Sequence, residues 1–294
     1  RPSRHPVDRL GRLVRRLRSA VPLVTARGVF LSLLGDVIQF FRRVPLAEFL
    51  FAPEWTPLFA EPRYGIAPLL AGTFLVTAIA LFVAVPLGLA LAVYVSEYLP
   101  SDKRARVLGV LELFEGIPTV VFGYFALLFV TPLLQKVIPG LSLFNPLSAG
   151  LVMGFAILPY VSNVAADAMQ SVPRSIREAA YALGARPYEV ALKVVLPAAL
   201  SGVIAAIILA ASRAIGETMI VAIAAGQRPT LTLDPRETIA TMTSYIVQAA
   251  TGDQPTGSTA YYALFAVGFT LFLLTLALNV LAQYIVERYR ERYE

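Results

Sequence analysis

Two ionisable residues, Arg213 and Glu217, lie four positions apart inside a long apolar run. Charged side chains at such a depth are costly unless they are paired or face a cavity. A guanidinium presents N–H donors in a planar fork, which suits a tetrahedral oxyanion. On one continuous helix this spacing places both side chains on the same face, where the carboxylate could hold the arginine and limit how tightly an anion binds. The residues alone leave a second reading open, a structural ion pair that helps helices to pack.

A second feature of chemical interest is the break Gly116-Ile117-Pro118 in another apolar run. Proline has no backbone N–H and glycine frees the chain, so a helix should restart at Pro118. Its free N–H groups and the hydroxyl of Thr119 would point towards the interior of the bundle, as at half-helix sites for anionic substrates. Thr119 is therefore a third candidate for a substrate path, and a simple kink without substrate contact is the alternative.

The polar segment 171–197 has the pattern of two short helices around a glycine. Pro173 suits a helix start, and Ser175 and Glu178 have capping-box spacing. The helix should end at Gly184, and a second amphipathic segment follows. Such a knob could dock into the groove of a partner protein, although an ordinary amphipathic surface helix would share the pattern.

The elements that must position these residues are membrane spans. The 294 residues are 57% hydrophobic and 15% charged, with a mean hydropathy of +0.69. The apolar residues gather in runs of about 20, the length that crosses a bilayer core. We predict an all-α polytopic membrane protein with six transmembrane helices, at residues 19–41, 66–95, 107–134, 146–165, 198–225 and 261–286.

The basic residues predict the orientation of these spans. Seventeen of the 25 Lys and Arg residues lie in 1–18, 96–106, 166–197 and 287–294. Cytoplasmic loops are enriched in Lys and Arg, so both termini and the loop 171–197 should be cytoplasmic. The domain prediction is a basic arm over 1–18 and a single transmembrane domain over 19–294. The loop 226–260 should lie outside, with a short helix near 237–248.

Several functions are excluded or disfavoured by what the sequence contains. The chain has no cysteine, and its one histidine, His5, lies in an arginine-rich stretch and is expected at the surface rather than on a metal. A phosphate-binding loop needs Gly-Lys-Ser/Thr, yet Lys103, Lys136 and Lys193 are followed by Arg or Val. The net charge is +6, but the basic residues flank apolar spans, so the charge does not indicate binding to nucleic acid. We expect a transport subunit that is not itself an enzyme.

The segment 171–197 resembles the EAA loop of bacterial ABC importer permeases. The residues that carry the match are Glu178, Ala179, Ala180, Gly184, Leu196 and Pro197, with Val194 where the family often has Ile. The resemblance implies a type I ABC importer permease fold. It also implies that this loop couples to a separate ATP-binding subunit, so that ATP and Mg belong to the partner and this chain holds no cofactor.

The string RAIGETM, which contains Arg213 and Glu217, resembles the phosphate-specific (Pst) permeases and looks more like the PstC subunit than PstA. Segments 84–98 and 111–124 agree, and the likeness runs from about residue 48 to the C-terminus. It implies that both residues take part in phosphate passage. The implied partners are a PstA-type second permease, a PstB-type ATPase dimer, a PstS-type external phosphate-binding protein and the lipid of a bacterial inner membrane.

Two features depart from that family. Glu115 stands where a small apolar residue is expected, and Arg27, with Asp36 nearby, interrupts the first predicted span. Alternatives to the phosphate permease are an ABC permease for another oxyanion such as sulfate or molybdate, an autonomous anion carrier or channel, and a membrane enzyme. The RAIGETM string distinguishes a phosphate permease from a permease for another oxyanion, and the EAA loop argues against an autonomous carrier or channel.

Overall fold

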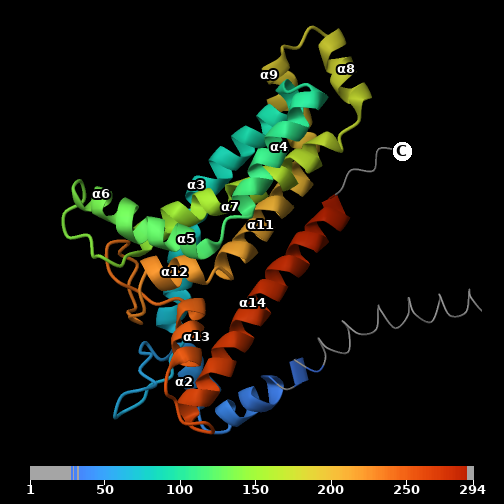
Figure 1. Ribbon diagram of the computed structural model, residues 1–294. Helices are drawn as coiled ribbons and strands as arrows, with labels where there is room; N and C mark the ends of the chain where they lie inside the picture. Colours follow the sequence, from blue (N-terminus) through green and yellow to red (C-terminus); the bar gives the residue numbers. More distant parts are fainter. Residues whose placement is uncertain (1–27, 29, 32, 290–294) are drawn as a thin grey trace, which may run out of the picture.

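The computed structural model describes residue 28 and residues 30, 31 and 33–289. In this part of the chain helices dominate, in an elongated bundle with α8 and α9 at one end and α2 and α13 at the other (Figure 1). Residues 33–41 are helical. The labelled elements are α2 (Leu46–Phe51), α3 (Ala67–Val93), α4 (Ser101–Glu115), α5 (Thr119–Phe125), α6 (Thr131–Gln135), α7 (Pro146–Gln170), α8 (Arg174–Ala182), α9 (Pro187–Glu189), α10 (Leu196–Ala198), α11 (Leu200–Ile215), α12 (Met219–Ala224), α13 (Met242–Thr251) and α14 (Thr259–Tyr289). Three π-helical segments connect some of them, η1 (Tyr94–Tyr98), η2 (Ala126–Val130) and η3 (Val190–Val195).

Three helices are long and apolar enough to cross a membrane: Ala67–Tyr98, Pro146–Gln170 and Thr259–Arg288. They match the predicted spans at 66–95, 146–165 and 261–286. Two bent pairs raise the number of possible spans in the described residues to five. The predicted count of six is therefore not confirmed, since residues 1–27, with the arm 1–18 and the start of the first predicted span, lie outside the described residues.

The helices α3 and α7 form the central pair of the bundle. Glycines allow this close approach, because a Cβ at Gly150 would come within 2.7 Å of Ile79 and one at Gly154 within 2.8 Å of the Ala80 carbonyl oxygen. Without water as a competitor, such small residues let the backbones of membrane helices pack by van der Waals contact. Asn145 starts α7 by accepting a 2.7 Å hydrogen bond from the Ser148 N–H.

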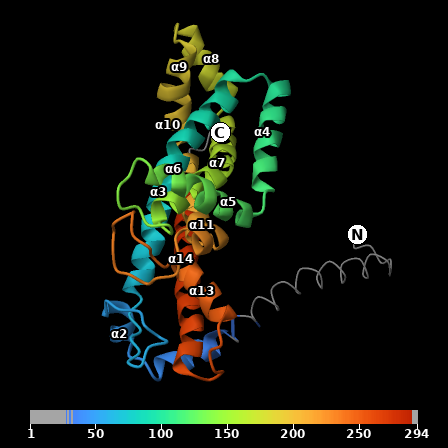
Figure 2. The same cartoon turned by 60° about the vertical axis from the view of Figure 1, so that its left-hand side comes forward.

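The predicted span at 107–134 is two helical arms rather than one rod. α4 and the arm formed by α5, η2 and α6 meet at a bend of 77° around Gly116–Pro118. Figure 2 shows α4 standing beside the central pair, joined to α5 at this corner. The predicted restart is confirmed, with Pro118 preceding the first residue of α5, Thr119. Glu115, the last residue of α4, lies at the corner and is partly exposed.

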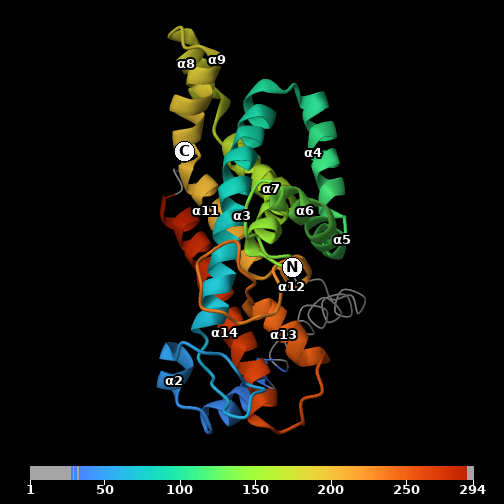
Figure 3. The same ribbon diagram turned by 90° about the vertical axis from the view of Figure 1, so that its left-hand side faces the viewer.

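The end of the bundle that carries α2 and α13 lies at the bottom of Figure 3. An aromatic cluster packs there. Phe40, Phe49, Trp55 and Tyr64 pack edge to face with centroid separations of 5.5 to 6.3 Å. The helix predicted near 237–248 begins later, at Met242. Thr241 caps it by accepting a 3.0 Å bond from the Ser244 N–H, so this capping pair, rather than Glu237, marks the start of the helix.

Candidate functional site

The segment containing Arg213 and Glu217 is not one helix. α11 ends at Ile215, and α12 begins at Met219 after a break at residues 216–218. Thr243 fixes the break from α13, because its hydroxyl donates a 2.8 Å hydrogen bond to the Glu217 carbonyl oxygen. The prediction of one continuous span over 198–225, with both side chains on one helix face, is wrong. The physical reason is that Gly216 ends α11 and the polar Thr243 satisfies the backbone released there.

Glu217 uses its carboxylate to cap α12. Its Oε1 accepts hydrogen bonds from the N–H groups of Met219 at 3.1 Å and Ile220 at 3.4 Å. The first N–H groups of a helix lack partners within the helix, and the positive end of the helix dipole favours an anion. The carboxylate charge is thus balanced by the helix that follows it.

Arg213 lies in the last turn of α11, with its side chain exposed. Its guanidinium carbon sits 5.3 Å from the centre of the Tyr160 ring on α7, a cation–π contact. Within the described residues the ion pairs join other side chains, and none joins Arg213 to Glu217. The structure therefore brings the two residues to one break but leaves the guanidinium donors facing outward.

Thr119 opens α5, and its residue is partly exposed. One turn later Gly123 lies against α12, where an added Cβ would be 3.1 Å from the Met219 carbonyl oxygen. The helices α5 and α12 therefore pack side by side, as Figure 1 also shows. The structure gives Thr119 no hydrogen bond to Arg213 or Glu217 in the described part, so its place in a path stays a prediction.

The predicted docking loop forms a projecting helical tip. α8 runs from Arg174 to Ala182 after Pro173, and Gly184 follows with a φ of +83°, a left-handed conformation that glycine adopts without strain. These features confirm the predicted start and end. The capping box at Ser175 and Glu178 is wrong, because the helix already begins at Arg174 and both residues are inside it.

The coupling residues lie on this tip and on the helical segment that returns to the bundle. Glu178, Ala179, Gly184 and Pro197 are exposed, and Ala180 and Leu196 are half-buried. Leu183, beside the glycine, is 89% exposed. Tyr181 and Tyr188 are also exposed on this tip. A group of exposed large side chains, unlike a single one, has the character of a contact surface.

Partly buried charged groups that sequence reasoning missed tie the tip and α4 to the end of the long span α3. Arg177 of α8 makes two hydrogen bonds to the Glu97 carboxylate of η1, at 3.0 and 3.1 Å. Arg104 of α4 donates to the Val95 and Ser96 carbonyl oxygens of η1, at 2.9 and 2.7 Å. The available signals were an arginine directly before the EAA residues and a lone glutamate at the end of a long span.

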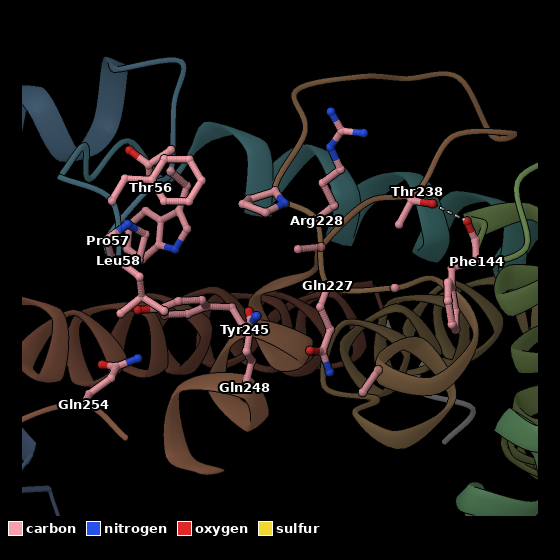
Figure 4. Close-up of a pocket in the computed structure, with 16 residues that line it drawn as sticks. Thr56, Pro57, Leu58, Phe144, Gln227, Arg228, Thr238, Tyr245, Gln248 and Gln254 are labelled. Carbon is pink, nitrogen blue, oxygen red and sulfur yellow. Dashed lines mark hydrogen bonds between the residues drawn. The ribbon is translucent and has the colours of Figure 1, made fainter. Parts of the chain in front are cut away.

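The cavity in Figure 4 lies at the other end of the molecule. It has a volume of about 780 Å³ and is lined by the loop 55–59, residues 226–229 and α13, including Tyr245, Gln248 and Arg228. One wall is fixed by the Thr238 hydroxyl, which donates a 2.8 Å bond to the Phe144 carbonyl oxygen. Arg213, Glu217 and Thr119 do not line this cavity, so it is distinct from the break in α11–α12.

Known proteins resemble this chain over most of its length. Residues 84–291 match the family model described as "Binding-protein-dependent transport system inner membrane component". The probable ABC transporter permease YqgH of Bacillus subtilis is 32% identical, covering 88% of this chain and 84% of the relative. The phosphate transport system permease PstC of Xylella fastidiosa (strain 9a5c) is 32% identical, covering 82% of this chain and 79% of the relative.

Solved structures agree on the fold. A chain of a bacterial alginate ABC transporter, crystallised in complex with an alginate pentasaccharide-bound periplasmic protein, superimposes with a TM-score of 0.59 at 17% identity, covering 96% of this chain and 99% of that one. A chain of the MetNI methionine ABC transporter gives 0.52 at 18% identity, covering 75% and 94%. Together these matches establish the predicted all-α ABC importer permease fold. The chain is a multi-pass membrane protein that belongs to the family of binding-protein-dependent transport system inner membrane components, in the branch of the PstC-type permeases.

Proposed function

We propose that this chain is a membrane-spanning subunit of an ATP-driven importer of inorganic phosphate and forms part of the translocation path. The observation that carries the proposal is the Arg213 guanidinium at the break between α11 and α12, which is exposed and has no carboxylate partner in the part of the chain that the structure describes. PstC relatives at about 30% identity support phosphate as the substrate.

Arg213 is the residue that binds the passing anion. A guanidinium can donate two parallel hydrogen bonds to a phosphate, and it remains charged at any physiological pH. The Tyr160 ring holds the guanidinium carbon without using its N–H donors. Glu217 shapes the path by fixing the start of α12, and Thr119 is the first residue of α5, the helix that packs against α12.

A second, PstA-type permease completes the path, and a PstS-type binding protein delivers phosphate from outside. The tip formed by α8 and Gly184 docks on a PstB-type ATPase dimer, which binds ATP and Mg. The excess of Lys and Arg supports a cytoplasmic position for this tip and for both termini in a bacterial inner membrane. The cavity of Figure 4 then lies on the external side.

ATP is needed because the membrane potential opposes the import of an anion. Each elementary charge costs about 2.3 kcal/mol per 100 mV. Phosphate carries one to two negative charges near neutral pH, so an inside-negative potential works against its entry.

The test is ATP hydrolysis and uptake by the complex of both permeases and the ATPase dimer in vesicles, with the binding protein outside. Binding protein loaded with phosphate should stimulate hydrolysis and uptake, and sulfate should do neither. Stimulation by sulfate would leave the assignment as an ABC permease intact and would show that the substrate is not phosphate. Uptake independent of ATP would contradict the proposal as a whole.

A further inference from the structure

The tip formed by α8 joins the bundle through a shielded ion pair outside the EAA residues. Glu97 lies at the end of η1, directly after the long span α3, and Arg177 lies one turn into α8. Their side chains are 5% and 16% exposed. The guanidinium meets the carboxylate with two hydrogen bonds, Nε to Oε2 at 3.1 Å and Nη2 to Oε1 at 3.0 Å. This bidentate geometry fixes the relative orientation of the two groups as well as their distance.

Both partners have further bonds that tie them to their own surroundings. The Ser96 hydroxyl donates to Glu97 Oε1 at 2.7 Å. Arg177 also donates to the Met169 carbonyl oxygen at 2.8 Å and to the Val172 carbonyl oxygen. These carbonyls lie in the last turn of α7 and just after it, where the regular hydrogen-bond pattern of the helix ends. Arg177 therefore joins α8 to the ends of both central helices.

The end of α3 is in turn fixed to α4. Arg104 donates to carbonyl oxygens of Val95, Ser96 and Leu99, which belong to η1 or directly follow it. The apolar surroundings are shared as well, because Val95, Met169 and Val172 belong to one buried cluster with residues of the return segment Val190–Val195. The end of α3 is thus a node where charged bonds from two other helices meet.

We propose that the Glu97–Arg177 pair is the joint through which movement of α8 is passed to the spans α3 and α7. The inference rests on the proposed function, because it needs an ATPase that moves α8. An apolar contact alone allows sliding, whereas a bidentate pair between shielded groups resists both translation and rotation. Both are positioning residues, since neither is expected to touch phosphate or ATP.

The first test uses Glu97→Gln and Arg177→Gln in the reconstituted four-component complex. The readout is the ratio of phosphate taken up to ATP hydrolysed, which a merely structural role would not change once the amount of assembled complex is measured. We expect the ratio to fall roughly fivefold or more, the lower end of coupling between linked sites. ATP hydrolysis itself should continue.

Asp234→Asn is the matched control. It removes a carboxylate from another ion pair, the one with Arg236 at 2.6 Å, which is exposed and lies far along the chain from α8. Its uptake-to-hydrolysis ratio should equal that of the unmodified complex. An unchanged uptake-to-hydrolysis ratio in both Gln variants would contradict the proposal that the pair transmits movement. Phosphate-stimulated hydrolysis in the same experiment would still support the proposed function.

A second test removes the dependence on folding of the Gln variants. The chain has no cysteine, so Glu97→Cys together with Arg177→Cys introduces two unique thiols. A short, reducible bifunctional thiol reagent should restore the ratio when it bridges them, and a reductant should lower it again in the same vesicles. Failure of the bridged form to couple better than its reduced form would count against the proposal. If the unmodified complex showed no phosphate-stimulated hydrolysis, the proposed function itself would be at fault.

Discussion

Arg177, in the tip helix α8, and Arg213, in the last turn of α11, have contrasting surroundings. Arg177 is 16% exposed and shares its donors among a carboxylate and two backbone carbonyls. Arg213 is exposed, contacts the face of Tyr160 and has no carboxylate partner among the described residues. The nearby Glu217 does not compensate it, because that carboxylate is bonded to the start of α12.

The difference shows how to separate a structural cation from a functional one. A shielded arginine whose donors are nearly all used, as four of the five N–H groups of Arg177 are, contributes to the fold and has little left to offer a ligand. An arginine whose N–H donors have no partners adds little to the stability of the fold, so its presence in an apolar segment needs a functional reason. By this criterion Arg177 positions helices and Arg213 is available to an anion.

The largest expected effect is the loss of phosphate uptake in Arg213→Gln. Two charge-assisted hydrogen bonds are worth at least about 3 kcal/mol together, which corresponds to roughly a hundredfold or more. The loss of one exposed cation–π contact costs only about 0.5–1 kcal/mol of stability. Uptake of radiolabelled phosphate and thermal unfolding in detergent measure the two quantities. Retained uptake would contradict the assignment of Arg213 to the path.

The opposite profile is expected for Arg177→Gln. Removing one partner leaves Glu97 buried and unpaired, and breaking a buried pair in this way costs about 3 kcal/mol or more. The unfolding temperature of the solubilised chain should fall by roughly 6 °C or more. An unfolding temperature as high as that of Arg213→Gln would show that the two regions do not differ as described. Glu97→Gln, which keeps an acceptor, provides the milder comparison.

Glu217 sharpens the comparison because its role here is to cap a helix. Glu217→Ala should destabilise the chain by about 1 kcal/mol, the usual cost of a lost cap. Glu217→Gln keeps an oxygen acceptor for the Met219 N–H and should lose about half as much. Uptake by Glu217→Gln should stay within several-fold of normal. A complete loss in the Gln variant would instead indicate that the charge itself acts on the anion.

The smallest effect is expected at the exposed pair of Asp234 and Arg236. The guanidinium beside it lowers the pKa of the Asp234 carboxyl from 3.8 to about 2. A group whose pKa falls on folding stabilises the native chain above its ordinary pKa, and that contribution disappears as the pH falls through about 2. Both side chains are partly solvated, so this contribution is small even above about pH 4, where it is fully present, and Asp234→Asn should lower the unfolding temperature there far less than Arg177→Gln does. A marked shift there would mean that exposed pairs matter as much as buried ones in this protein.

The parts of the molecule that follow from local chemistry could be predicted from the sequence. Pro173 and Gly184 mark the limits of α8 because proline suits a helix start and glycine tolerates a positive φ. Pro118 likewise marks the start of α5. The long spans α3, α7 and α14 followed from apolar length alone.

What could not be predicted depends on residues distant in the chain. The apolar run through 198–225 looks continuous in the sequence, but α11 ends at Ile215. The hydrogen bond that Thr243 donates to the Glu217 carbonyl oxygen within this break comes from 26 positions further along the chain. The partner of Arg177 is 80 positions away. Tyr160 reads as an ordinary residue of an apolar helix until α11 is placed beside it. The contacts between helices therefore determine the part of the site that hydrophobic periodicity cannot predict.

The glycines between α3 and α7 also bear on how the protein is made. The two helices touch at Gly150 and Gly154 with no space for a Cβ, yet α4, α5 and α6 are synthesised between them. Membrane helices insert individually and associate afterwards. The central pair therefore forms only after α7 has been synthesised and inserted. Until then α3 lies in the bilayer without the helix that it packs against. Larger side chains at these glycines would act on biogenesis, yielding inserted chains whose central helices never dock.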